Sequence, residues 1–391
     1  MSEREGSQRE RGASRTGGPA LAPGGPSEER TLRRKVTEVE VGERIEAMRR
    51  RRPRFVDERI TTAHGAGGKA SRALVEGVIV PLLENDALAP LGDAALLEVG
   101  GARLALTTDA FVVRPIRFPG GSIGELAVNG TVNDLAVTGA RPLALSVALV
   151  LEEGLPADVL RGEVTAMAEA ARAAGVPVVT GDTKVVERGK CDSMYVVTTG
   201  VGVREHDVPL GPEQVRPGDK VLVSGTIGDH GVAIMLARGD LDIEADVRSD
   251  TRPLWTLAEA LLDACGPGLH CMRDATRGGV ATVLNEIALA AEVGVVIAED
   301  RLPLRRDVVG AGEILGIDPL YVANEGKLVV FVAADRADAA LAAARSVPAG
   351  ADAALVGEVR AEPPGRVLAR TGFGGHRMID MLVGDPLPRI C

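Results

Sequence analysis

The chain has 391 residues, of which 45% are hydrophobic and only 2% aromatic, and its formal net charge is -10. This length allows two or three domains with buried cores, but the acidic balance argues against nucleic acid as the main partner, because phosphate contacts need a surplus of Lys and Arg. No apolar run is long enough to span a bilayer, and no basic start is followed by the apolar stretch of a secretory signal. The sequence therefore predicts a globular protein of the cytoplasm.

Residues 1–57 are predicted to form a mostly disordered extension. They are rich in Gly, Pro, Ser, Arg and Glu and poor in large apolar residues. A composition of this kind buries too little apolar surface to offset the entropy of ordering the chain. We therefore expect the folded part to begin near residue 58.

From residue 58 onward, strand-like and helix-like stretches alternate. Ser122 is expected to cap a helix that ends at Thr138, because Glu125 stands at the spacing of a capping box. A second helix over 157–174 ends at Gly175, a typical C-terminal residue. The other elements predicted here are a hairpin over 96–99 and 103–113 that turns at Gly100-Gly101, and strands over 143–151, 176–180 and 194–203.

A second half begins near Arg216, where a Pro-Gly-Asp turn precedes a short apolar run. We expect strands over 221–223, 328–333 and 354–359, and a long apolar helix over 278–293. Because strands and helices interleave in both halves, the predicted class is α/β, or α+β layers. The predicted division is an N-terminal domain over 58–215, a C-terminal domain over 216–383 and a mobile tail over 384–391.

A glycine loop, His64-Gly65-Ala66-Gly67-Gly68-Lys69, precedes a helical stretch over 70–80. Backbone N–H groups at a helix start, together with a lysine, can hold phosphate. The spacing differs from that of a P-loop, which needs four residues between its glycines and a Ser or Thr after the lysine. A flexible turn with no ligand therefore stays open as the alternative.

Five aspartates lie in Gly- or Thr-rich contexts at the edges of predicted elements. A single aspartate of this kind is more often a turn or cap residue. Five together favour a site for magnesium and nucleotide, because Mg²⁺ is usually held by a few carboxylates together with phosphates. The five are Asp93, Asp109, Asp134, Asp182 and Asp274.

The predicted tail ends in a cysteine, Cys391, after the prolines 386 and 388. Prolines favour extended backbone, and eight such residues reach at most roughly 26 Å. The thiolate is the reactive form of cysteine and needs nearby positive charge at neutral pH; Arg389 is a local candidate. A frayed terminus that happens to end in cysteine is the alternative. Cys265, His270 and Cys271 are close in sequence but match no common zinc pattern.

The order and wording of these motifs closely resemble the HypE family, the maturation proteins that make the cyanide ligands of NiFe hydrogenases. The resemblance covers residues 58–391. Related ATP-using enzymes, namely aminoimidazole ribonucleotide synthetase, selenophosphate synthetase and thiamine-phosphate kinase, share the aspartate loops but lack the tail that ends in cysteine. The motifs that carry the resemblance are the glycine loop, the five aspartate segments, 118–121, 151–156, 223–231, 323–327 and Pro388-Arg389-Ile390-Cys391.

This resemblance implies a two-domain α/β protein whose N-terminal domains pair across a homodimer. It implies that HypF delivers a carbamoyl group to Cys391, that ATP is used to dehydrate this group to a thiocyanate, and that the cyano group passes to iron on a HypC–HypD complex. ATP and Mg²⁺ are then expected between the glycine loop (Gly65, Gly67, Gly68 and Lys69) and the five aspartates.

Loss of water from the carbamoyl group also requires loss of protons from nitrogen, for which a carboxylate is suited. By the same resemblance we expect Glu325 to be the base and Lys184 its charge partner near the modified cysteine. A structural salt bridge is the alternative for this pair. His64 and His230 either bind phosphate or cap loops.

Two other classes of function remain open at this point. One is a different ATP-dependent enzyme of the same architecture that acts on a free small molecule. The other is a non-catalytic thiol carrier or metal chaperone, in which the aspartate loops have only a structural role.

Overall fold

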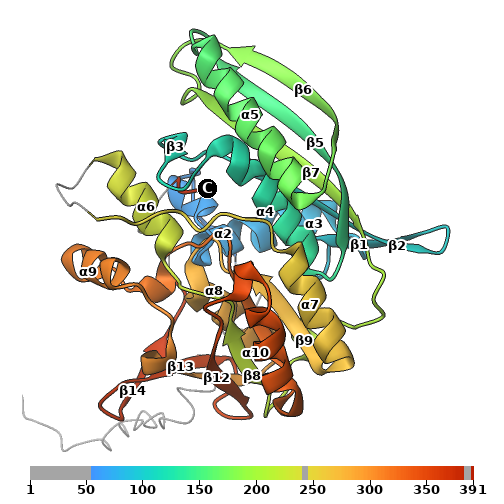
Figure 1. Ribbon diagram of the computed structural model, residues 1–391, viewed down its shortest axis with the longest axis vertical. Helices are drawn as coiled ribbons and strands as arrows, with labels where there is room; N and C mark the ends of the chain where they lie inside the picture. Colours follow the sequence, from blue (N-terminus) through green and yellow to red (C-terminus); the bar gives the residue numbers. More distant parts are fainter. Residues whose placement is uncertain (1–53, 240–244, 383–388) are drawn as a thin grey trace, which may run out of the picture. The chain divides into compact units, whose positions relative to one another are not determined.

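The structure, a computed structural model, describes residues 54–239, 245–382 and 389–391. Residues 1–53 of the predicted extension, and most of the predicted tail, lie outside the described residues. Residues 50–391 belong to one compact unit, and its described part is built on two β-sheets with helices packed against them (Figure 1). This mixed architecture confirms the predicted fold class. No described helix has the length and apolar character needed to cross a membrane.

The first sheet has five strands in the order β1-β2-β7-β5-β6. Only the β5–β6 pair is parallel. Helix α4 packs against β2 and β7, and α5 packs against α4, so both helices cover the same face (Figure 1). The bounds are β1 (Ala95–Val99), β2 (Ala102–Phe111), α4 (Ile123–Val137), β5 (Arg141–Glu152), α5 (Ala157–Ala174), β6 (Val178–Val186) and β7 (Met194–Val203).

The two faces of this sheet differ because side chains alternate along each strand. Phe111 of β2 pairs with Val196 of β7, and both are buried under α4 and α5. The next residues along β7, Tyr195 and Val197, point to the opposite face, which no helix of the described chain covers. Leu106 of β2 lies on that open face and is 42% exposed.

The second sheet has seven strands in the order β14-β13-β10-β12-β8-β11-β9, with only β10 and β13 parallel. Val221 and Val223 of β8 pack in the cluster around α8, whereas Leu222 packs in the cluster around α7 and α10. Strand alternation thus builds a core on each face. The bounds are β8 (Lys220–Val223), α7 (Trp255–Cys265), β9 (Leu269–Asp274), α8 (Gly279–Ala290), β10 (Gly294–Ala298), β11 (Leu328–Val332), α10 (Ala337–Arg345), β12 (Ala354–Arg360), β13 (Arg366–Arg370) and β14 (His376–Ile379).

The remaining elements are short and lie around the two sheets. The chain enters through α2 and α3, makes a two-stranded ribbon of β3 and β4 before α4, and adds α6 and α9 in the second half. Their bounds are α2 (Lys69–Leu74), α3 (Val80–Leu83), β3 (Arg117–Phe118), β4 (Gly121–Ser122), α6 (Asp229–Arg238) and α9 (Arg306–Leu315).

The predicted capping box at α4 is wrong, although the helix starts where expected. The Ser122 hydroxyl is buried without a hydrogen-bond partner. Instead, the Gly124 N–H donates at 3.2 Å to the carboxylate of Glu163, which is a fully buried residue of α5. A carboxylate from a neighbouring helix thus replaces the local cap at the positive end of the helix dipole.

Candidate active site around the docked carboxyl terminus

Four of the five predicted aspartates lie together. Asp93 precedes β1, Asp109 is in β2, Asp134 is in α4 and Asp274 ends β9, so both sheets contribute. One carboxylate oxygen from each of Asp93, Asp134 and Asp274 lies within 4.8 Å of the others. All four line a cavity of about 210 Å³ together with Cys391.

Burial and mutual repulsion govern the charge of this cluster. Burial, and next the charge of the neighbouring Asp93, raise the pKa of Asp274 to about 7. Burial is also the main reason that the pKa of Asp134 lies well above its usual range, with Asp274 next. Arg273 partly offsets this repulsion through an ion pair of 3.0 Å with Asp93. Converging carboxylates, of which Asp274 is buried and the others half-buried, fit a hard divalent cation such as Mg²⁺, which would compensate their charge.

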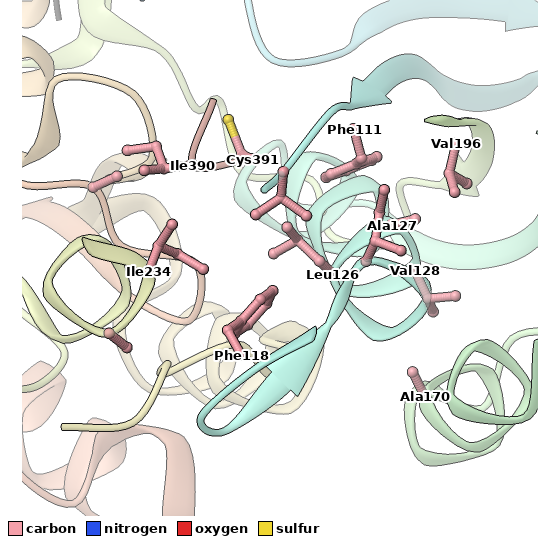
Figure 2. Close-up of a cluster of buried hydrophobic side chains, with 14 of the residues drawn as sticks. Phe111, Phe118, Leu126, Ala127, Val128, Ala170, Val196, Ile234, Ile390 and Cys391 are labelled. Atoms are coloured by element: carbon pink, nitrogen blue, oxygen red, sulfur yellow. The ribbon is translucent and has the colours of Figure 1, made fainter. Parts of the chain in front are cut away.

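The last three residues of the chain are docked against the segment that follows β2. The Val112 N–H donates to the carbonyl of Cys391 at 3.1 Å, and the Arg114 N–H donates to that of Arg389 at 3.3 Å. Ile390 is 2% exposed and belongs to the core cluster formed by α4, α5 and α6 (Figure 2). The end of the chain is therefore bound inside the protein by backbone hydrogen bonds and apolar contact.

His230 of α6 contributes to this docking. Its Nε2 lies 2.6 Å from the carbonyl oxygen of Ile390, and its Nδ1 lies 2.8 Å from the Ser249 hydroxyl. Because a carbonyl only accepts, Nε2 carries the proton. Burial lowers the pKa of His230, which favours this neutral form. In this arrangement both ring nitrogens of His230 are engaged, one by the carboxyl-terminal segment and one by Ser249.

The Cys391 thiol faces the acidic cavity, and its electrostatic partner is Arg277. The Arg277 Nε donates to Cys391 Sγ at 3.1 Å. Burial nevertheless raises the pKa of Cys391 to about 12, against the opposing effect of Arg277. The docked sulfur is therefore protonated at neutral pH and is a poor nucleophile in this position. The guanidinium of Arg389, expected beside the thiol, is instead ion-paired with Asp192.

Glu325 lines the same cavity as Cys391. It is 3% exposed, and its Oε1 has no hydrogen-bond partner among the described residues. Burial raises its pKa well above the usual range, and Asp109 adds to the effect. Its main-chain N–H donates to Asp250 at 3.0 Å, which fixes the backbone. The carboxylate is thus held in place yet free to accept a proton.

Lys184 and Asp182 are not brought to this cavity within one chain. They are paired with each other on β6 at 2.6 Å, and both side chains are more than 60% exposed, at 69% and 63%. The register pairs Lys184 with Val150 and Val150 with Tyr195, so Lys184 points to the open face of the sheet. Asp109, by contrast, pairs with Thr198 on the face that α4 covers. The sheet itself therefore separates these residues from the acidic cluster.

Of the glycine loop, only Gly67 lines the cavity. Its φ is +80°, and a Cβ placed there would lie 2.5 Å from the Cβ of Arg277, so a side chain cannot fit. Gly65 and Gly68 lie outside the lining, and the Lys69 ammonium pairs with Asp380 at 3.0 Å. His64 contacts Asp57 and Thr61 nearby.

Sequence reasoning missed Arg273 and Arg277, which flank Asp274 in one motif. The sequence does contain a signal for both arginines. An arginine on each side of an aspartate at the end of a strand is placed to balance the charge of a carboxylate cluster. Two other residues noted in the sequence, His270 and Cys271, lie in the protein core. His270 contacts Asp219 at 2.7 Å, and Cys271 is 2% exposed.

Removing the hydrogen bond of His230 should expose the terminal thiol. We expect His230→Phe to raise the rate of Cys391 alkylation by iodoacetamide about tenfold, because one hydrogen bond to the docked end is lost. Peptide mapping separates Cys391 from the other three cysteines, all of which are buried. His206→Phe, a change at a residue remote in sequence that contacts Asp263, is the control. Equal rates in the wild type and His230→Phe would contradict the docked arrangement.

Comparison with known proteins first defines a class. Residues 91–204 match the family of AIR synthase related proteins in its N-terminal domain, and residues 216–369 match the C-terminal domain. The chain is therefore a two-domain protein of the AIR synthase related type.

The nearer relatives narrow this class. The carbamoyl dehydratase HypE of Rhodobacter capsulatus is 55% identical over 338 residues, which cover 86% of this chain and 99% of the relative. The Escherichia coli K12 protein of the same name is 45% identical over 337 residues, which cover 85% of this chain and 99% of that relative. The chain belongs to the HypE family.

Solved structures agree with this assignment. A HypE–HypF complex aligns with a TM-score of 0.76 at 45% identity, covering 79% of this chain and all of that one. A HypE structure in complex with ATP aligns with a TM-score of 0.71 at 46% identity, covering 85% of this chain and 100% of the other.

Proposed function

We propose that this protein uses ATP to dehydrate a carbamoyl group on the sulfur of Cys391 to a thiocyanate, which supplies cyanide ligands to NiFe hydrogenase iron. The observation that carries the proposal is the position of Cys391. Its sulfur lies in one cavity with the acidic cluster and Glu325. The relatives named carbamoyl dehydratase, and the HypE structure in complex with ATP, support the same activity.

The chemistry requires an activated oxygen. The carbamoyl oxygen is a poor leaving group, so it first attacks the γ-phosphorus of ATP, and ADP leaves. The C–O bond then breaks and phosphate departs with the original oxygen, while nitrogen loses two protons in all and a C≡N bond forms. The net change is the loss of one water, with ATP converted to ADP and phosphate.

The residues around the sulfur suit this sequence. Glu325 is the base for the N–H protons, because burial raises its pKa and thus makes its ionised form a stronger proton acceptor than an exposed glutamate. Arg277, which donates to the sulfur, orients the carbamoyl group. The apolar surroundings of Ile390 keep bulk water from the reacting group.

Asp93, Asp109, Asp134 and Asp274 would hold Mg²⁺, and Gly65, Gly67, Gly68 and Lys69 would contribute to ATP binding. The donor set is all oxygen and carries the charge that such a cation compensates. When bound, Mg²⁺ neutralises the triphosphate and aligns the phosphoryl group for transfer. For Lys69 to reach a phosphate, its surface pair with Asp380 must open.

The docked thiol cannot collect its own carbamoyl group, because it is buried and protonated. The end of the chain must therefore leave the cavity to meet a carbamoyl donor. We propose a HypF-like carbamoyltransferase as this donor, which agrees with the solved HypE–HypF complex. A HypC–HypD complex is the proposed acceptor of the cyano group.

A homodimer would complete the site. The open face of the five-stranded sheet carries Leu106, Tyr195 and Val197, an apolar surface that a second copy could cover. Asp182 and Lys184 lie on the same face. If they act in catalysis, they act on the cavity of the second copy, with Lys184 as the charge partner of Glu325.

This arrangement predicts complementation between subunits. Asp182→Asn alone should abolish water loss while sparing carbamoylation, and Asp274→Asn alone should do the same. When the two variants are mixed and allowed to exchange subunits, about a quarter of the wild-type activity should return, because half of the dimers are mixed and each holds one intact site. The measurement is ATP-dependent water loss in the mixture. No recovery from a mixture shown to contain mixed dimers would place Asp182 outside the partner's site.

Deleting Ile390-Cys391 tests the function itself. In a single turnover with ATP, we expect phosphate release from the purified, carbamoylated full chain. The shortened chain, taken through the same carbamoylation reaction, should release none, because it has no cysteine to carry the group. An enzyme that acts on a free small molecule keeps its ATP turnover after this deletion. A non-catalytic carrier releases no phosphate even from the carbamoylated full chain.

A further inference from the structure

A second polar cavity, of about 260 Å³, lies at the carboxyl end of β8. It shares no lining residue with the cavity around Cys391. The two are separated by the segment 323–327, which carries Glu325 toward one and Lys327 toward the other. The activity proposed above makes no use of this second cavity.

The loop Ser224-Gly225-Thr226, which leads from β8 to α6, supplies hydrogen-bond donors to the cavity. Within the described chain, the N–H groups of Gly225 and Thr226 donate to no acceptor. The Ser224 hydroxyl oxygen accepts from the Leu328 N–H at 2.8 Å, but its own proton has no acceptor there. Three donors in one short loop without partners are costly unless water or a ligand accepts from them.

A buried ammonium adds positive charge. Lys327 is 4% exposed, and within the described chain its ammonium pairs with Asp250 at 3.1 Å. An ammonium has three N–H donors, so this pair leaves others available to a ligand. A Cβ at Gly225 would lie 3.1 Å from Lys327 Cε, so glycine lets the loop approach the lysine closely. The backbone donors and the ammonium therefore converge on the same space.

One cation of the cavity has no ion pair in the described chain. Arg248, Arg252 and Arg305 line it with Lys327, against three aspartates. Two of these aspartates are already paired with cavity cations, since Arg305 lies 3.3 Å from Asp229 and Lys327 pairs with Asp250. Arg248 pairs with Asp246, outside the lining, at 3.6 Å, so Arg252 is the cation of this cavity that makes no ion pair in the described chain.

We propose that this cavity binds a phosphate-type oxyanion, held by the Ser224-Gly225-Thr226 loop, Lys327 and Arg252. Backbone N–H groups between a strand and a helix, a hydroxyl and fixed cations are the groups that recognise a tetrahedral oxyanion. The volume is below the range of about 300–1,000 Å³ usual for drug-sized ligands. It therefore suits inorganic phosphate, or one phosphate group of a larger molecule, better than a whole nucleotide.

Such an anion would be linked to Glu325. Asp250 accepts from the Glu325 N–H through Oδ1 and pairs with Lys327 through Oδ2. An oxyanion bound to Lys327 would therefore compete with Asp250 for the ammonium. Because Asp250 also fixes the backbone of Glu325, binding at this cavity would affect the position of Glu325.

Calorimetric titration of the full chain with inorganic phosphate, without Mg²⁺, tests the proposal. We expect binding to the wild type that weakens at least about tenfold in Arg252→Gln, since a charged hydrogen bond to the anion is lost. Arg360→Gln is the matched control, because Arg360 pairs with Glu358 and does not line the cavity. Thermal unfolding without phosphate checks that each variant is folded.

Titration with ADP under the same conditions identifies the source of the anion. If Arg252→Gln weakens binding of ADP but the wild type does not bind phosphate, the occupant is the phosphate group of a nucleotide. If Arg252→Gln weakens neither, the proposal is overturned. Crystals soaked in tungstate should show an anomalous peak between Lys327 and Ser224. Tungstate that binds only at other places would also overturn the proposal. None of these outcomes depends on dehydration at Cys391.

Discussion

Glu325→Gln should leave carbamoylation of Cys391 intact but slow the loss of water by about 10²–10⁴-fold, the usual contribution of a general base. The amide keeps the shape of the side chain but cannot accept a proton. The measurement is single-turnover conversion of purified carbamoylated protein, followed by mass spectrometry. Glu286→Gln is the matched control, because Glu286 lines the same cavity but contacts Arg273. A normal rate in Glu325→Gln would remove Glu325 from the reaction.

The pH dependence of the same step has a definite sign. Glu325 must be ionised to act as a base, and burial raises its pKa well above the usual range. The rate should therefore fall as pH falls through this raised pKa, at a higher pH than an exposed glutamate with a pKa near 4.3 would give. A rate that stays level down to about pH 5 would contradict the raised pKa.

Asp274→Asn should stabilise the protein without Mg²⁺ and remove its response to Mg²⁺. The pKa of Asp274 is raised to about 7 in the folded state, above its value in an unfolded chain. Stability from its protonated form is therefore present at low pH and lost as pH rises through about 7. At about pH 8 the ionised group repels its neighbours, so the neutral asparagine should add on the order of 2 kcal/mol to the free energy of unfolding.

Thermal unfolding with and without Mg²⁺, at about pH 6 and about pH 8, measures both effects. In the wild type, Mg²⁺ should raise the unfolding temperature more at the higher pH, where the carboxylates are ionised. Asp207→Asn is the control, because Asp207 is exposed and paired with Arg103 outside the cavity, and its unfolding should respond to Mg²⁺ like the wild type. Asp274→Asn with lower stability and a full Mg²⁺ response would show that the cluster is not a cation site.

The elements that the sequence predicted share clear local signals. The hairpin at Gly100-Gly101 and the helix that ends at Gly175 are present as β1–β2 and α5, because glycine with positive φ fixes each turn. The predicted helix over 278–293 ran too far. It ends at Ala290, and β10 starts at Gly294. The boundary was missed because apolar residues resume directly after Glu292, so the pattern does not separate the helix from the strand.

The site was less accessible from the sequence because its parts come together through long-range contacts. The Gly and Thr contexts picked out Asp93, Asp109, Asp134 and Asp274, which the structure brings to one cavity. The same reasoning included Asp182, but only the register of β5 and β6 determines which face it occupies.

The position of the chain end is the clearest case. Its docking depends on hydrogen bonds from Val112 and His230, residues more than a hundred positions away in sequence. A pattern of prolines indicates an extended segment but does not say where it binds. The partner of the thiol is likewise Arg277, remote in sequence, and not the adjacent Arg389.

Intact-mass spectrometry of the full chain tests the central claim most directly. After incubation with a carbamoyl donor enzyme, carbamoyl phosphate and ATP, we predict a mass gain of one carbamoyl group on Cys391, followed by an ATP-dependent loss of one water. Both changes should be absent in Cys391→Ala. A carbamoylated Cys391 that never loses water in the presence of ATP and Mg²⁺, or the same mass changes in Cys391→Ala, would contradict the account.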